Sequence, residues 1–249
     1  CSSDLPDVAS EPPPAKADVV VVGSGITGLS AAMTLAREGL EVVVLEAGVP
    51  GFGASSRNAG FIGRTLKHSL SELISTHGEA HALRVYGEMR EAFDCVVDLI
   101  ADEQINCHYT PCGRYMAAHS AAQYEAMARE LELKHKLLGD SFEMVPKSEQ
   151  VREIGSDHYC GGAVVPELGS LHPGLYQLGL LSRARDSGAS VLGGIRVDAL
   201  EAEPDGVRVR TARGPITARH AFVATNGYTT AATPWLARRV VPFRAYMLA

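Results

Sequence analysis

The residues of this chain that are best suited to chemistry form a glycine motif near its beginning. Gly23-Ser-Gly25-Ile-Thr-Gly28 has the spacing G-x-G-x-x-G. In that spacing the first glycine permits a tight turn, the second lets backbone approach a pyrophosphate, and the third lets a helix pack closely on a strand. Backbone N–H groups and the helix dipole after such a turn, beginning at Ile26, bind phosphate oxygens without a lysine. The motif therefore predicts a dinucleotide site.

A carboxylate at Glu46, eighteen residues after Gly28, extends this prediction. An acid at such a position accepts hydrogen bonds from ribose hydroxyls, and its charge repels a 2′-phosphate. FAD or NAD is therefore favoured over NADP, and Ala47 is placed in the same site as the neighbour of Glu46.

These residues require a strand, a helix and a second strand to position them. Asp18–Val22 and Val42–Leu45 are short, β-branched apolar runs, typical of buried parallel strands. Between them, apolar residues recur at steps of three and four, at Ile26, Leu29, Met33 and Ala36. This spacing predicts an amphipathic helix that ends at Gly39. In this context the glycine motif is far more specific than it would be alone.

Two further segments carry small and polar residues suited to a ligand. Gly51–Gly63 is rich in glycine, hydroxyl and amide groups, which suits backbone lying against a planar polar ligand. Its Phe52, Phe61 and Ile62 would be unfavourable in a solvated loop, so we interpret the segment as lining a ligand. Thr225–Tyr228 follows an apolar strand, and the carboxyl ends of strands are where open α/β sheets bind ligands.

Composition excludes several other classes of protein. The chain has 249 residues, 46% of them apolar, and a formal net charge of −6. Such a chain can bury a sizeable core or form two domains. No basic bias indicates binding to nucleic acid, and no run of ~20 apolar residues predicts a membrane span. A cytoplasmic protein is therefore expected.

Neither the cysteines nor the histidines predict a metal site. The five cysteines are odd in number and contain no C-x-x-C pair, so reduced thiols are expected. His77 and His81 would share a helix face, but no third ligand accompanies them. His172 precedes Pro173 and is more typical of a helix cap or a packed neutral histidine than of a catalytic base.

Beyond Gly63 the regular α/β alternation is interrupted. Apolar periodicity predicts helices over 78–105, 121–138 and 172–181. Strand patterns are expected over 113–117, 161–165, 189–192, 195–201, 207–211, 216–218 and 221–224, and another strand is expected to begin at Arg239.

Taken together, Val20–Gly28, Glu46, Gly53–Gly60 and Ala224–Tyr228 resemble the FAD-dependent D-amino-acid oxidase superfamily, in particular its glycine, sarcosine and γ-glutamylputrescine oxidase-like branch. The resemblance implies an α/β fold in which an α+β substrate domain, here incomplete, is inserted into a Rossmann-type FAD-binding domain. The implied boundaries are a leader over 1–16, FAD-binding segments over 17–105 and 172–235, a substrate-domain insertion over 106–171, and the start of another substrate-domain segment over 236–249. Residues 1–5 are left out of fold reasoning; a processed lipoprotein start and an expression or sequencing scar are two hypotheses for them.

The resemblance also implies which residues bind the cofactor. Gly23, Gly25 and Gly28 would hold the pyrophosphate, Glu46 would hold the adenosine ribose, and the backbone of Val197 would meet the adenine. The pyrophosphate and flavin would be lined by Ser55, Ser56, Arg57, Asn58, Ala59 and Gly60, with Thr225, Asn226 and Gly227 closing over the cofactor. No catalytic residue, metal ligand or oligomeric state is assigned.

The expected substrate is a small-molecule amine or amino acid. Hydride would pass from the carbon that bears nitrogen to flavin N5, the imine would hydrolyse, and oxygen would regenerate the flavin and form hydrogen peroxide. Because family members are longer, the chain is expected to be an N-terminal fragment that is poorly soluble and binds flavin weakly by itself. An NAD-dependent dehydrogenase and a non-catalytic flavin-binding fragment remain as alternatives.

Overall fold

The computed structural model describes residues 12–243. The predicted leader therefore lies largely outside the described residues, and so does 244–249 of the predicted last segment. The chain divides into two compact units. The first comprises residues up to Ala59, Ile105–Cys107 and the chain from His172 onward; the second comprises Gly60–Gln104 and His108–Leu171.

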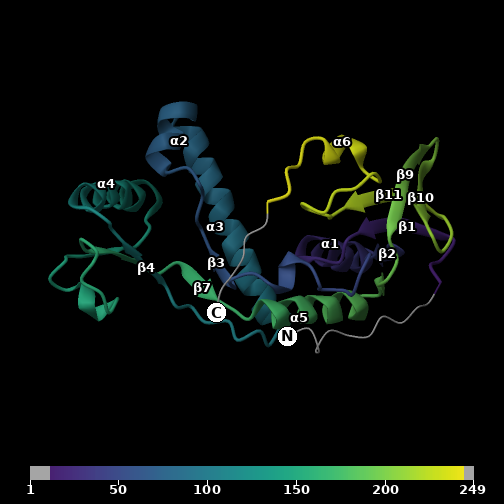
Figure 1. The fold of residues 1–249 in the computed structure, drawn as a ribbon, viewed down its shortest axis with the longest axis horizontal. Coiled ribbons are helices and arrows are strands. Elements are labelled where there is room, and N and C mark those ends of the chain that lie inside the picture. Colours follow the sequence, from purple (N-terminus) through teal and green to yellow (C-terminus); the bar gives the residue numbers. More distant parts are fainter. Residues whose placement is uncertain (1–11, 244–249) are drawn as a thin grey trace. The chain divides into compact units, whose positions relative to one another are not determined.

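The first unit is built on a six-stranded sheet, shown with its helices in Figure 1. Its strands are β1 (Lys16–Val22), β2 (Val42–Leu45), β8 (Ser190–Leu192), β9 (Val197–Glu203), β10 (Gly206–Thr211) and β11 (Ile216–Val223). They lie in the order β8-β2-β1-β11-β10-β9. The first four in this order are parallel, whereas β11, β10 and β9 form an antiparallel meander. This is the mixed form of a Rossmann-type sheet.

Strand β1 is buried on both faces, as its uniform apolar sequence predicts. Val20 and Val21 are fully buried and point to opposite sides of the sheet. Val21 lies under helix α1 (Ile26–Arg37), and α5 (Pro173–Asp186) packs against α1. On the other face, Val20 belongs to an apolar cluster with Leu45, Val209 and others. Covering both faces in this way fixes the position of the loop that follows β1.

Several predicted elements of the first unit differ from the structure. The segments 216–218 and 221–224 are one continuous strand, β11, because pairing with β1 continues through His220. Helix α5 extends five residues beyond the predicted end at 181, to Asp186. No strand begins at Arg239 within the described residues; a short helix, α6 (Pro234–Ala237), precedes it and residues 239–243 have no regular structure.

The second unit combines three helices with two small antiparallel sheets. Its helices are α2 (Leu70–His77), α3 (Glu79–Asp102) and α4 (Ala121–Leu138). One sheet pairs β3 (Phe61–Gly63) with β7 (Leu168–Ser170), and the other has the order β4-β6-β5, comprising Arg114–Ala117, Gly162–Val165 and Glu143–Val145. A short 3-10 turn, η2, spans Gln150–Arg152.

The predicted helices and strands of this unit are present, with additional short elements. Gly78 separates α2 from α3 and adopts a φ of +83°, which favours glycine over other residues. Leu70, Ala82 and Tyr86 form the buried cluster between these helices. Strands β3, β5 and β7 have three residues each, too short to produce a recognisable alternation.

Within residues 12–243, no helix is both long enough and apolar enough to cross a membrane.

Candidate dinucleotide-binding site

The three glycines of the motif are enforced by packing in the first unit. Gly23 has a φ of +104°, and a Cβ there would lie 2.8 Å from the carbonyl oxygen of Ala224. A Cβ on Gly28 would lie only 2.0 Å from the carbonyl oxygen of Gly23, and one on Gly25 would lie 2.9 Å from Ser55 Oγ. Real side-chain carbons do not approach other atoms so closely, and at Gly23 and Gly28 the opposing atom is backbone, whereas at Gly25 it is a serine hydroxyl that can rotate away. Glycine therefore lets helix α1 begin directly against the end of β1.

Helix α1 begins without a side-chain cap at Gly25 and without an acidic residue in its first turn. No carboxylate in the first turn of α1 therefore neutralises the positive end of the helix dipole. One first-turn group is occupied, since Ile26 N–H donates to Ser55 Oγ at 3.1 Å. Ser55 comes from the 3-10 turn η1 (Ala54–Ser56), so this contact joins two segments of the predicted site.

Glu46 is held in place by hydrogen bonds from the same turn. Its Oε2 accepts from Ser24 N–H at 3.0 Å and from Ser24 Oγ at 2.8 Å, while Oε1 accepts from Gly48 N–H at 3.0 Å. These donors fill three of the roughly four acceptor positions of a carboxylate. The carboxylate thus has a fixed direction and capacity for one more donor. Ala47, beside it, is exposed.

The segment between β8 and β9 runs beside Glu46. Glu46 N–H donates to Leu192 O at 2.9 Å, and Ile195 N–H donates to Glu46 O at 2.8 Å. Val197, two residues later, begins β9 and is 6% exposed. The backbone at the predicted adenine position is therefore tied to the predicted ribose ligand.

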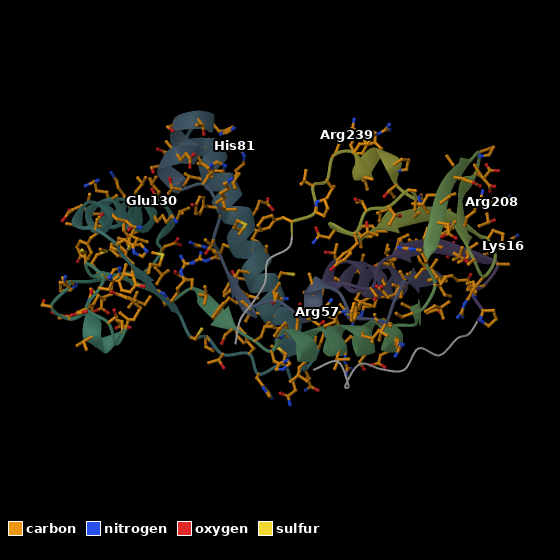
Figure 2. All side chains as sticks on the ribbon, in the orientation of Figure 1. Lys16, Arg57, His81, Glu130, Arg208 and Arg239 are labelled. Atoms are coloured by element: carbon orange, nitrogen blue, oxygen red, sulfur yellow. The ribbon has the colours of Figure 1, made fainter. Side chains whose placement is uncertain are left out.

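Polar side chains in and after η1 donate hydrogen bonds to backbone carbonyl oxygens of the same segment. Asn58 Nδ2 donates to Ala54 O at 3.2 Å and to Ser55 O at 3.0 Å, and Ser56 Oγ bonds to Gly51 O. The guanidinium of Arg57, labelled in Figure 2, stacks 4.2 Å from the ring centroid of Phe52. Arg57, Asn58 and Ala59 are exposed, so they are available to a ligand rather than packed in the core.

The predicted ligand-lining segment divides between the two units. Gly60 belongs to the second unit, where its carbonyl oxygen accepts from Leu171 N–H at 2.8 Å. Phe61 begins strand β3 and is 65% exposed, and Phe52 in the first unit is 54% exposed. Two of the three apolar side chains on which the interpretation depended are therefore exposed, Ile62 is half-buried, and the ligand-lining role of 51–63 remains a prediction.

Thr225 lies directly after β11, next to the glycine turn. A Cβ on Gly23 would lie 3.7 Å from Thr225 N. Within residues 12–243 the Thr225 hydroxyl is buried and has no hydrogen-bond partner. Asn226 adopts a left-handed φ of +47°, and Tyr228 N–H donates to Thr225 O at 2.9 Å, which closes a tight turn. A buried hydroxyl without a partner is costly, and this one has its full capacity to bond a ligand.

The fold thus brings the glycine motif, Ser55, Glu46 and Thr225 together from four separate segments of the sequence. Sequence reasoning missed Ser24, which bonds Glu46, and Gln177 of α5, whose Nε2 donates to Ser24 O at 2.6 Å. Gln177 is 1% exposed on a helix whose buried positions are otherwise mainly apolar. That interruption of an apolar face was the available signal. His172, as expected for a cap, accepts Leu175 N–H through Nδ1 at 3.1 Å.

The second unit contains a cavity of about 300 Å³ that the sequence did not predict. Side chains of both charges line it. Arg64 pairs with Asp140 at 3.3 Å and Glu167 at 2.9 Å, and Glu130 of α4, labelled in Figure 2, accepts from Leu70 N–H at 2.6 Å. Burial, followed by the charges of Glu130 and Asp140, raises the pKa of Tyr86 to about 12.

Comparison with known proteins identifies the family of the chain. The family described as DAO: FAD dependent oxidoreductase matches residues 18–249, and the chain belongs to that family. FAD is the cofactor of this family. FAD therefore accounts for the glycine motif and for Glu46 without NAD.

Individual relatives cover most of this chain. It is 33% identical over 226 residues to gamma-glutamylputrescine oxidoreductase of Escherichia coli K12, a match that covers 90% of the chain and 53% of the relative. It is 30% identical over 233 residues to the probable oxidoreductase OrdL of Rhizobium meliloti, covering 93% and 54%. The fold is similar to glycine oxidase from Geobacillus kaustophilus, with a TM-score of 0.73, 20% identity, and coverage of 90% and 59%. The chain spans about half the length of the curated relatives it matches.

The residues present fit FAD. Gly23 and Gly25 place no side chain over the backbone of the turn, the first turn of α1 has no acidic residue, and the Thr225 hydroxyl is buried without a partner in the described part of the chain. These features suit an anionic pyrophosphate with polar groups on either side.

Proposed function

We propose that the complete protein is an FAD-dependent oxidoreductase that oxidises the C–N bond of a small amine or amino acid. The observation that carries the proposal is the site in which the glycine turn, Ser55, Glu46 and Thr225 converge. Membership of the FAD-dependent oxidoreductase family supports it. The named activities of the relatives, on gamma-glutamylputrescine and glycine, support an amine or amino-acid substrate.

In this proposal each segment of the site has a separate task. The turn made by Gly23, Gly25 and Gly28 holds the pyrophosphate, through the backbone N–H groups of Gly25 and of the start of α1, and Glu46 accepts a ribose hydroxyl. The backbone of Val197 meets the adenine. The remaining contacts to the pyrophosphate and flavin come from Ile26, Gly28, Ala47, Ser55, Ser56, Arg57, Asn58, Ala59, Gly60, Thr225, Asn226 and Gly227.

When bound, FAD supplies the acceptor for the hydride from the carbon that bears nitrogen, and molecular oxygen reoxidises it with formation of hydrogen peroxide. The residues of the chain bind and orient the cofactor and the substrate. The first unit holds the cofactor through backbone groups, and the segment 106–171 contributes to substrate recognition, in line with the predicted domain division. The imine product hydrolyses in water.

The test is an absorbance spectrum of the protein expressed from its full reading frame, before and after anaerobic addition of a pooled panel of amines and amino acids. We expect a flavin spectrum that is bleached by the pool, and hydrogen peroxide when air is admitted. A flavin spectrum that no amine bleaches would favour a non-catalytic flavin protein. Retention of NAD without flavin would contradict the proposal.

Thr225 offers a sharper test of the site itself. Thr225→Val removes a buried hydroxyl without a protein partner and keeps the side chain's shape, so we expect the FAD-free protein to be equally or more stable. The same change should weaken FAD binding by roughly tenfold, since about 1.4 kcal/mol corresponds to a factor of ten. Thr211→Val, at a threonine on β10, is the control and should leave FAD affinity unchanged. Unchanged affinity in Thr225→Val would remove Thr225 from the site.

A further inference from the structure

Gln177 is a buried amide in a helix face that is otherwise packed with larger apolar groups. It is 1% exposed and lies among Tyr176, Leu180 and Leu181 of α5. Burying an amide costs free energy unless its atoms find hydrogen-bond partners. One atom has a partner, since Nε2 donates to Ser24 O at 2.6 Å, whereas Oε1 has none among the described residues. The hydrogen bond to Ser24 O is therefore the polar contact that orients this buried amide.

Ser24 connects Gln177 to Glu46. Ser24 is fully buried between Gly23 and Gly25, and its N–H and hydroxyl both donate to Glu46 Oε2, at 3.0 and 2.8 Å. Its carbonyl accepts from Gln177. All three polar groups of Ser24 are thus used in one path that runs from α5, through the glycine turn, to the carboxylate at the end of β2.

The direction of the Ser24 carbonyl matters for binding an anion. The residues on both sides of Ser24 are glycines, which restrain backbone rotation least. The Ser24–Gly25 peptide is trans, so its C=O and N–H point in opposite directions. While Gln177 holds the C=O toward α5, the Gly25 N–H points away from α5. A rotated peptide would instead present a carbonyl oxygen, whose partial charge repels phosphate.

We propose that Gln177 is a positioning residue for the cofactor. It orients the Ser24–Gly25 peptide so that an N–H group rather than a carbonyl faces the pyrophosphate, and through Ser24 it fixes the carboxylate of Glu46. This inference rests on the FAD binding described under the proposed function. Gln177 bonds the loop through Ser24 O, so we assign its effect to the position of Ser24.

The main experiment is a double-mutant cycle on FAD affinity in the protein expressed from its full reading frame. FAD dissociation constants are measured for wild type, Gln177→Leu, Glu46→Gln and the double variant. We expect each single change to weaken binding by roughly tenfold or more. Because both act through Ser24, the double variant should be clearly tighter than the product of the two single effects predicts.

Gln150 supplies a matched control in the second unit. It is also a buried glutamine, 3% exposed, whose Nε2 donates to Ser156 O and whose Oε1 accepts from Gly161 N–H, each at 2.8 Å. Gln150→Leu should lower the thermal stability and leave the FAD dissociation constant unchanged. A general loss of packing would instead lower stability in both variants and leave FAD affinity unchanged in both.

Gln177→Glu provides a second readout if the leucine variant does not fold. A protonated glutamic acid can donate to Ser24 O as the amide does, whereas the carboxylate cannot, and burial raises the pKa of a carboxyl group. FAD binding by this variant should tighten as the pH falls, with no matching change in wild type. Equal affinity in wild type and Gln177→Leu, additive effects in the cycle, or a pH profile like that of wild type would overturn the inference. Absence of FAD from the wild-type protein would overturn both this inference and the proposed function.

Discussion

The two units of this protein position functional groups by opposite means. In the first unit, the site consists largely of backbone, with Gly23 and Gly28 packed so closely against other backbone atoms that a single extra carbon would clash. In the second, the cavity is bordered by charged side chains, such as Arg64 between two carboxylates. Adding atoms should therefore damage the first unit most, and removing charges should damage the second most.

The largest effect is expected for Gly28→Ala in the first unit. The new Cβ would lie 2.0 Å from the carbonyl oxygen of Gly23, so helix α1 must move away from β1. Overpacking of this kind costs about 3 kcal/mol, and FAD affinity should fall by more than tenfold. Denaturant unfolding and FAD titration measure the two effects. Gly53→Ala, where nothing lies within 4 Å, is the control; equal stability of the two variants would contradict the packing argument.

Arg64→Gln should have the next largest effect, in the second unit. The Arg64 side chain is 11% exposed. Without its guanidinium, the partly buried carboxylates of Asp140 and Glu167 each lose an ion-pair partner. We expect a loss of about 2–3 kcal/mol of unfolding free energy, somewhat below the cost of breaking a fully buried pair. Arg152→Gln is the control, because the Arg152 side chain is 42% exposed and solvent-exposed ion pairs contribute little to stability. Similar losses in the two variants would show that burial does not distinguish these ion pairs.

Removing the Glu130 carboxylate should have a smaller effect that is specific to α2. Glu130 accepts from Leu70 N–H at 2.6 Å, Ser71 N–H at 3.3 Å and Ser71 Oγ at 2.6 Å, and so caps α2 from α4. Glu130→Ala should cost about 1.5–2 kcal/mol, since hydrogen bonds to charged groups are among the stronger ones. Hydrogen exchange should show faster opening of the first turn of α2. Glu132→Ala, at an exposed position of the same helix, should not change exchange in α2.

The smallest effect concerns alkaline pH. The pKa of Tyr86 is about 12 in the folded protein, compared with 10 for a free tyrosine, because burial and nearby carboxylates disfavour the phenolate. Between these pH values the unfolded chain loses the Tyr86 proton while the folded chain keeps it. The contribution of Tyr86 to the free energy of unfolding is therefore fully present below pH 10 and is lost as the pH rises toward 12. Tyr86→Phe should reduce the loss of unfolding free energy between pH 10 and pH 12. It should also remove one tyrosine that ionises near pH 12 from an ultraviolet absorbance titration. A variant that retains the full titration would place the late ionisation elsewhere.

Local sequence patterns were sufficient for the parts of the fold with strong periodicity. The run Asp18–Val22 predicted a buried strand because β-branched residues without polar alternation suit a strand covered on both faces. The spacing of the glycines predicted the turn and helix α1 for the same kind of local steric reason. The strands β3, β5 and β7 were missed because three residues carry no measurable period, whereas the equally short β8 was found from its apolar residues Val191 and Leu192.

By itself, the sequence determined the glycine turn, the buried strands beside it and an acid after the second strand, because each depends on neighbouring residues and their intrinsic backbone preferences. Only the tertiary structure decided that Gln177, 153 residues away from Ser24 in sequence, bonds the carbonyl inside that turn. It likewise decided that the Thr225 backbone lies beside Gly23 with its hydroxyl buried, and that Arg64 meets Asp140 and Glu167. Such contacts depend on the packing of separate elements, and no local pattern of residues encodes which distant side chain a folded backbone will meet.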